Sequence, residues 1–383
     1  MTLPATMYSK NTIPNPTSAL TDFSVMINLA HMGADWWTAN GTEADGTKGR
    51  AAKDDGTELA TDWIDFDHAA ETGWVRVKWS GTLANSGTQT IRVYPPVTGN
   101  SANAASATYG SDNAYDSGWV LYWHFNEDPS GSAPQVTGRV GGLDGNSSGT
   151  MLTADLVTSG PFGSSYDLDG TDDYIIAAAN GAGGITTQFT TITWAYPRTL
   201  ETTAISALQT PAGNDFAWSV NLRSTGEIRL YVDGIGTNDR STHSSAVVAD
   251  EWQMVSAVWG VGADTQTIYV DDSAIAASFT PTGGSSSLAS RTPYEEVADL
   301  PVTVGFWYFS GVTTLDGIVA SHQVHSVARH GDWIAHEHNQ TSDNATFFGT
   351  WTNVSPSSAI GSTNLLKSTL LSSTLLSSTL IRS

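Results

Sequence analysis

Short apolar runs separated by turn-forming residues recur along most of this chain, and they constrain its fold more than any other feature. Residues 74–79 (WVRVKW) alternate apolar and charged side chains, which is the period of a half-buried strand. Glycine totals 37 residues, and pairs such as Asp233-Gly234 and Gly283-Gly284 stand between the runs. Many short strands with little helix between them predict an all-β, antiparallel sandwich.

The strands group into two blocks. We expect strands over 25–29, 74–79 and 90–94 in the first block, and over 119–125, 173–178, 189–196, 216–222, 227–232, 252–259, 266–270, 301–307 and 315–325 in the second. One helix is predicted over 331–339. A stretch rich in Ala, Ser, Asn and Gly over 97–116 predicts the boundary. The expected organisation is an arm (1–20), a small β-sandwich-like domain (21–116), a larger sandwich (117–352) and a tail (353–383).

Composition excludes several classes of protein. Lys and Arg total 16 against 38 Asp and Glu, a formal net charge of −22, so we expect no nucleic-acid partner. Cysteine is absent, which excludes disulfides, thiolate nucleophiles and Cys-ligated zinc. No apolar run approaches the roughly 18 residues of a membrane span. Residues 1–16 lack the apolar core of a signal peptide, so we do not expect export by ordinary secretion.

The last residues form a leucine-serine repeat of period five, LLKST-LLSST-LLSST-LIRS. That period matches neither a helix nor a strand, so the aliphatic side chains would share no single face of either element. We expect them to be buried against the protein's own body, sister copies or a larger assembly. The predicted assembly residues are Leu365, Leu366, Leu370, Leu371, Leu375, Leu376, Leu380 and Ile381.

Six motifs in order resemble the laminin-G-like, concanavalin A-like jelly-roll family: residues 122–127 (YWHFNE), 166–174 (YDLDGTDDY), 189–195 (FTTITWA), 251–255 (EWQMV), 268–271 (IYVD) and 315–334. The resemblance implies a jelly roll with lectin-like binding, and calcium in some members. The family usually has an acidic residue soon after the Leu-Asp-Gly found here at 315–317, and this chain lacks it. The first block resembles a small β-rich domain of unknown function that often precedes such jelly rolls. The tail resembles those of tailed-phage virion proteins.

Asp167, Asp169, Asp172 and Asp173 place four carboxylates in seven residues around a glycine turn. Calcium prefers several oxygen ligands from one such loop, so the cluster is a candidate calcium site. The alternative is a tight hairpin in which the aspartates accept hydrogen bonds from backbone N–H groups. We expect no other cofactor.

Five histidines (His322, His325, His330, His336 and His338) invite a zinc interpretation. Their spacing makes the side chains diverge on the expected strand and helix, so we predict surface or capping histidines instead. Adjacent acids such as Glu295-Glu296 and Glu127-Asp128 do not form a spaced glycosidase pair, so we expect no catalytic residues and no enzyme.

Two aromatic pairs are candidates for an exposed sugar-stacking surface: Trp36-Trp37 in an expected loop, and Trp307-Tyr308 on an expected strand. For each pair the alternative is packing in the core.

These features predict a structural and adhesive protein: a tailed-phage virion surface protein (fibre, spike or head decoration) whose jelly roll binds a host-cell glycan. Expected partners are other virion proteins and sister copies, in a homo-oligomer that by analogy with fibres is a trimer. It would assemble in the host cytoplasm and remain on the virion surface. The alternative is a bacterial carbohydrate-binding adhesin module. A third class, a glycan-cleaving enzyme, lacks an identifiable carboxylate pair.

Overall fold

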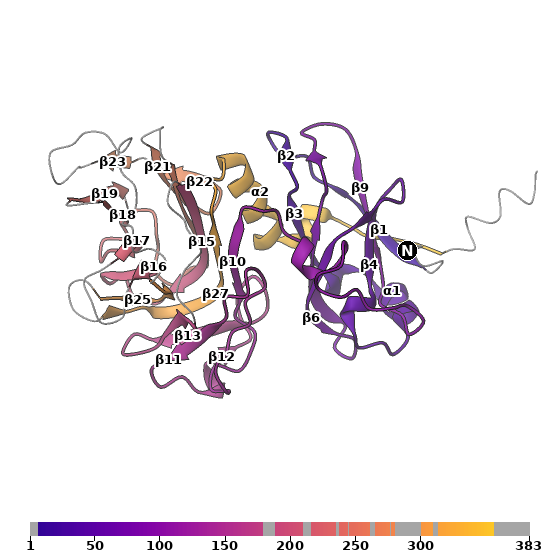
Figure 1. Ribbon diagram of the computed structural model, residues 1–383, viewed down its shortest axis with the longest axis horizontal. Helices are drawn as coiled ribbons and strands as arrows, with labels where there is room; N and C mark the ends of the chain where they lie inside the picture. Colours follow the sequence, from indigo (N-terminus) through magenta and orange to yellow (C-terminus); the bar gives the residue numbers. More distant parts are fainter. Residues whose placement is uncertain are drawn as a thin grey trace, which may run out of the picture.

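The computed structural model describes residues 7–178, 188–209, 216–234, 237–243, 245–260, 265–275, 277–279, 300–308 and 313–355. Two lobes of antiparallel sheet lie next to each other, and helix α2 (Gly331–Ser342) lies between them (Figure 1). The expected all-β sandwich class is confirmed. No helix within these ranges is both long and apolar enough to cross a membrane.

The first lobe is built around two sheets. Its five-stranded sheet has the order β28 (Thr352–Val354), β1 (Tyr8–Ile13), β9 (Gln89–Tyr94), β4 (Arg50–Lys53) and β5 (Glu58–Leu59). Its three-stranded sheet has the order β3 (Ser24–Asn28), β7 (Thr72–Lys78) and β6 (Thr61–Asp67), and β2 (Leu20–Thr21) pairs with β8 (Thr82–Leu83).

Both ends of the described chain join the first lobe. The prediction of an arm over 1–20 is wrong for Tyr8–Ile13, because this segment pairs with β9 on one side and β28 on the other. The start of the predicted tail at residue 353 is wrong for the same reason, since Thr352–Val354 is a strand of the lobe. Both segments are strands because they pair with segments that are distant in sequence. The local sequence gives no indication of that pairing.

The second lobe is a sandwich of two eight-stranded sheets. One sheet contains β12 (Leu156–Val157), β13 (Ser165–Asp169), β27 (Asp316–His325), β15 (Gln188–Pro197), β20 (Gln253–Gly260), β21 (Thr265–Val270) and β22 (Ser273–Ile275), with β10 (Trp119–His124) paired to β27. The other contains β11 (Gly145–Ser148), β14 (Tyr174–Ala177), β24 (Val302–Val304), β16 (Thr203–Gln209), β17 (Phe216–Leu222), β18 (Ile228–Gly234), β19 (Thr237–His243) and β23 (Ala277–Phe279). Large buried rings fill the space between them, among them Trp123, Phe189, Trp218 and Trp259.

The predicted strands and the predicted helix are present, with shifted ends. The run 301–307 is divided at Gly305, whose φ of 78° ends β24 before β25 (Phe306–Trp307), which pairs with β26 (Thr313–Thr314). The elements that were not predicted include strands β4, β6, β13, β16 and β19 and helix α1 (Ala34–Asn40). The remaining short elements are η1 (Leu29–His31), η2 (Gly46–Lys48), η3 (Ser111–Asn113), η4 (Thr153–Asp155) and α3 (Asn344–Phe348).

The sheet of the second lobe that contains β10, β15 and β27 is covered on both faces. The other sheet of the sandwich covers one face. On the opposite face, Trp119, Trp194 and Met254 belong to one continuous apolar cluster with Trp333 of α2 and with first-lobe residues such as Phe23. The two lobes therefore share a hydrophobic core, and α2 is the element around which they join.

Candidate ligand-binding sites

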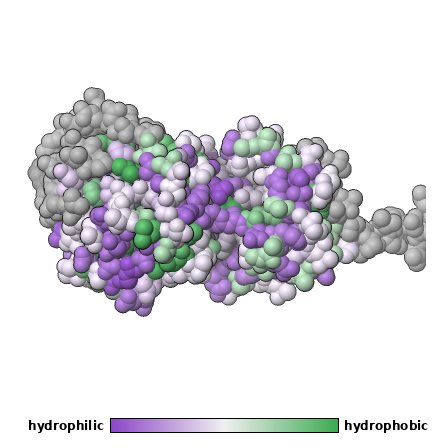
Figure 2. Space-filling view, turned by 90° about the horizontal axis from the view of Figure 1, so that it is seen from below, coloured by the Kyte–Doolittle hydropathy of each residue, from purple (hydrophilic) through white to green (hydrophobic). Residues whose placement is uncertain are grey.

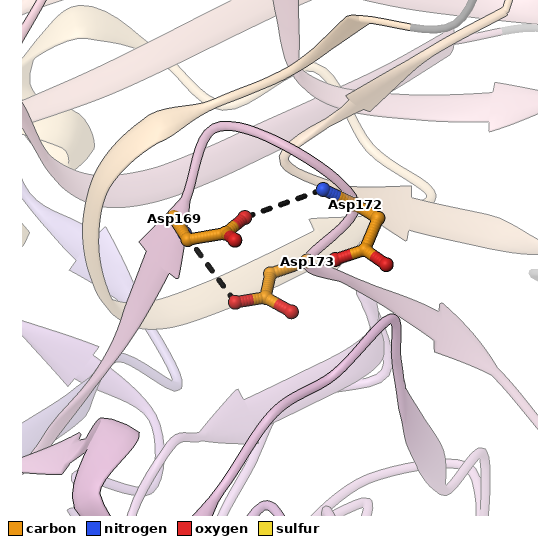
Figure 3. A group of neighbouring side chains, drawn as sticks. All are labelled: Asp169, Asp172 and Asp173. Carbon is orange, nitrogen blue, oxygen red and sulfur yellow. Dashed lines mark hydrogen bonds between the residues drawn. The ribbon is translucent and has the colours of Figure 1, made fainter.

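The acidic cluster predicted from the sequence lies in the turn after β13. Oxygen atoms of Asp169, Asp172 and Asp173 lie within 4.8 Å of one another (Figure 3). Asp169 Oδ1 accepts hydrogen bonds from the backbone N–H of Thr171 at 2.7 Å and of Asp172 at 3.2 Å. Asp173 accepts from Thr150 N–H at 3.1 Å and Asp169 N–H at 3.4 Å. These bonds build the hairpin of the alternative interpretation, and the same carboxylates remain close enough to hold a cation.

The electrostatics of the turn depend on burial. Burial, followed by the nearby charge of Asp169, raises the pKa of Asp173 to about 6. Backbone hydrogen bonds, first from Thr171, lower the pKa of Asp169. The two neighbouring acids therefore differ in the pH at which they ionise, and a cation that needs both as carboxylates would bind more weakly below about pH 6.

Asp167, the fourth predicted ligand, is not part of the cluster. Its carboxylate lies 2.6 Å from Nη2 of Arg198, whose Nε donates to Asp316 at 2.8 Å. Asp167 and Asp169 share one face of β13, but Arg198 holds the carboxylate of Asp167 and connects β13 to Asp316 of β27. The prediction that Asp167 joins the other three is wrong.

The aromatic residues predicted to be exposed are mostly buried. Trp36 and Trp37 are 0% and 2% exposed, because they lie on α1 rather than in a loop, and Trp36 Nε1 donates to Val93 O at 3.0 Å. Trp307 is 3% exposed and packs against Phe216. For these three the core-packing alternative is confirmed, and an exposed stacking surface there is wrong. Tyr308 is half-buried, with its ring centroid 6.4 Å from that of Phe306.

The histidines diverge as predicted, but most are not surface residues. His322 packs near Trp123 in the sandwich core, and His325 packs near Trp119 and Trp333 on the opposite face. His322 is fully buried between the two sheets, and His325 is fully buried because α2 and the first lobe cover the face that the sequence suggested was free. His336 is buried between two phenylalanine rings, while His338 stacks on Trp194.

Only His330 caps a helix, by accepting from Asp332 N–H at the start of α2. Burial is the largest cause that lowers the pKa of His322, to about 3, and that of His336, to about 4. Among the described residues, no group of three or more potential ligands includes a histidine, so the five histidines do not lie together as a set of metal ligands.

A cleft between the two lobes was not predicted. It has a volume of about 480 Å³ and is lined by residues 28, 30, 65 and 72–74 of the first lobe and by loop 160–164 of the second. Its apolar wall is an interlobe contact: the rings of Trp74 and Phe162 meet edge to face at 5.6 Å, and Trp74 Nε1 donates to Phe162 O at 3.1 Å. On the face seen in Figure 2, hydrophilic residues gather over the junction of the lobes.

A β-bulge places Asp65 in this cleft. The pairing of β6 with β7 shifts register between Ile64 and Asp67, and Asp65 takes a left-handed backbone conformation with φ of 52°. Gly73 on β7 has φ of 138°, and a Cβ there would lie 2.9 Å from the Cα of Phe66. The bulge on β6 therefore requires a glycine at position 73 of the neighbouring strand. Local sequence does not reveal that these two positions lie side by side.

Asp65 also touches the second lobe. Its Oδ2 lies 3.4 Å from Nε2 of the buried His124, and its Oδ1 accepts a hydrogen bond from the amide of Asn126. Burial raises the pKa of Asp65, but the hydrogen bond and charge of His124, together with Asn126, hold it below its ordinary value. Asp65 is thus a carboxylate held in place by the opposite lobe.

The predicted assembly residues 365–381 lie outside the described residues. The described chain ends at Ser355, next to β28. In Figure 1, β1 and β28 lie on the side of the first lobe away from the sandwich.

Comparison with protein families gives one match: residues 169–335 fit the model described as the concanavalin A-like lectin/glucanases superfamily. This segment is a concanavalin A-like domain. It begins at the acidic turn and ends within α2, so it includes most strands of the second lobe. The resemblance drawn from the sequence motifs is confirmed for the concanavalin A-like domain, while the first lobe lies outside the match. A search of curated proteins gives no match.

Solved structures similar to this chain are remote. A structure of botulinum neurotoxin type C, whose cell entry depends on interaction with two ganglioside molecules, is 11% identical with a TM-score of 0.41, over 58% of this chain and 51% of that one. Domain 4 of the Geobacillus stearothermophilus arabinanase AbnA, in complex with arabinotriose, is 14% identical with a TM-score of 0.40, over 58% and 98%. The Ruminococcus gnavus sialidase module CBM40, bound to sialyllactose, is 11% identical with a TM-score of 0.31, over 40% and 83%. Values this low say nothing of what this chain binds.

Proposed function

We propose that this chain is a non-enzymatic surface protein of a tailed-phage particle, as a fibre, spike or head decoration, and that it presents its concanavalin A-like domain to glycans of the host cell. The observation that supports glycan binding is the match of residues 169–335 to a lectin and glucanase superfamily. The virion role comes from the leucine-serine repeat at 365–381, whose aliphatic side chains need a partner surface.

The arrangement of the lobes suits display. The last described residues lie in the first lobe, on the side away from the concanavalin A-like domain (Figure 1). A chain attached through residues beyond Ser355 would therefore point its concanavalin A-like domain outward. A formal net charge of −22 favours solubility of densely arrayed copies.

The experiment compares the full chain with a chain ending at Ser355, each produced during infection by the phage that encodes it. Particles are purified and tested for the protein, and each form is tested for binding to arrayed cell-surface glycans. The proposal predicts glycan binding by both forms and particle association of the full chain alone. Glycan binding without any particle association would instead support a bacterial adhesin module, and absence of both would contradict the proposal.

A further inference from the structure

The cleft between the lobes is the described cavity that best combines size, polarity and rigidity. Its volume of about 480 Å³ lies in the range of small-molecule sites. Side chains from both lobes line it, and both lobes are fixed to each other by a fully buried ion pair between Arg76 and Glu337. The side chains that would contact a ligand are already in position, which reduces the conformational entropy lost on binding.

The lining selects against charged ligands. No Lys, Arg or His is among the residues that line the cleft, so an anionic group would find no counter-ion. The carboxylate of Asp65 accepts a hydrogen bond from Asn126 and lies 3.4 Å from Nε2 of His124, so it is not an isolated charge without polar neighbours. The chemistry of the cleft therefore suits a neutral polar molecule.

The polar groups that remain suit hydroxyl ligands. Each oxygen of Asp65 has a further lone pair to accept an O–H donor. Asn28 uses its side-chain oxygen to cap η1 through Ala30 N–H at 3.0 Å, and its NH₂ group makes no hydrogen bond to the described residues. Ser164 lines the cleft, and its buried Oγ has no hydrogen-bond partner among the described residues. Thr72 adds an exposed hydroxyl at the rim.

Apolar side chains also line the cleft. The cleft that holds the Asp65 carboxylate and the Asn28 amide is also lined by Pro161, Phe162 and Trp74. A pyranose ring has polar hydroxyls around its edge and apolar C–H groups on its faces, so it needs both kinds of contact at once. We propose that this interlobe cleft binds one neutral saccharide unit, with Asp65 accepting hydrogen bonds from its hydroxyl groups. The inference rests on the proposed glycan-binding role and assigns it a site.

The test uses the full chain and ligand-detected saturation-transfer NMR with D-glucose, D-galactose, N-acetyl-D-glucosamine and lactose at millimolar concentrations. Ala30→Trp fills the cleft from an exposed position on η1. Ala69→Trp, at an exposed alanine of the β6–β7 turn that does not line the cleft, is the matched control. Asp65→Asn removes the acceptor charge with little change of shape. Equal melting temperatures for the two tryptophan variants verify that both are folded.

We expect at least one saccharide to bind the wild type and the Ala69→Trp variant equally. Ala30→Trp should weaken binding at least about tenfold because the ring occupies the cleft. Asp65→Asn should also weaken it at least about tenfold, which corresponds to the loss of about one charge-assisted hydrogen bond. Two results overturn the proposal: no saccharide binds, or binding is unchanged by Ala30→Trp. If Ala30→Trp leaves binding to an arrayed cell-surface glycan intact, the cleft assignment is wrong while the proposed glycan function stands.

Discussion

Arg76 and Glu337 form an ion pair with both side chains completely buried, at 2.6 Å between Nη2 and Oε1. Arg76 comes from β7 of the first lobe, and Glu337 comes from α2. Gln323 of β27 donates to Glu337 Oε1 at 2.9 Å, which adds the concanavalin A-like domain to the same network. The ion pair thus lies where β7 meets β27 and α2, two elements that are close to each other in sequence and far from β7.

Glu337→Gln should destabilise the whole chain by about 3–5 kcal/mol, because it leaves the Arg76 charge buried without a partner. Guanidinium unfolding followed by tryptophan fluorescence measures this. An Arg76→Met, Glu337→Leu double variant is the control, since it removes both charges and should lose less. A loss below about 1 kcal/mol in Glu337→Gln would show that the pair does not join the lobes energetically.

The buried histidines should make the protein sensitive to acid. Their pKa values in the folded state are lowered, to about 3 for His322 and about 4 for His336. The unfolded chain therefore binds protons first, so stability is full above about pH 6.5 and falls as pH decreases toward the folded values. Asp173, with its pKa raised to about 6, has the opposite effect, since the folded state gains relative stability as pH falls through 6.

His336→Phe isolates one of these contributions, because the side chain already packs between Phe23 and Phe347. In the wild type the free energy of unfolding should fall as pH decreases from 6.5 to 4, and the variant should reduce that slope by up to about 1.4 kcal/mol per pH unit. Urea unfolding at several pH values measures the slope. An unchanged slope would mean that His336 is protonated equally in both states.

Asp169→Ala tests what the acidic turn does. It removes two hydrogen bonds to backbone N–H groups and should cost about 0.5–2 kcal/mol whether or not calcium is added. Thermal unfolding in calcium and in chelator gives the comparison. If calcium raises the melting temperature of the wild type but not of Asp169→Ala, the turn is a calcium site and the hairpin interpretation is incomplete.

Two truncations separate the tail from the fold. A chain ending at Ser355 keeps β28 and should retain wild-type stability but fail to join sister copies. A chain ending at Thr350 also lacks Trp351, which packs on Phe348, and lacks β28, which pairs with β1. Its free energy of unfolding should be lower by about 3 kcal/mol or more. Denaturant unfolding and light scattering measure the two properties. Self-association of the Ser355 form would place the oligomer contact elsewhere.

Much of the fold was predictable because local patterns determine it. The alternation in 74–79 gives β7, and the spacing of Trp333, Ile334 and Glu337 gives α2. The motifs around 166–174 led to the correct superfamily for 169–335.

The rest depends on contacts between distant segments. Trp36 and Trp37 are core residues because α1 packs into the first lobe, and His325 is buried because α2 covers its face of the sheet. Asp65 lies in the cleft because Gly73 permits a bulge on the neighbouring strand. None of these relationships appears in a window of local sequence, and so the cleft was missed.

The central proposal, that this chain is a virion surface protein attached through its leucine-serine repeat, is tested most directly by quantitative mass spectrometry of phage particles purified from a lysate of cells that express it. The account predicts several copies of the full chain in each particle and none of a form ending at Ser355. Recovery of the full chain only in the soluble fraction of the lysate, with none in the particles, would contradict it.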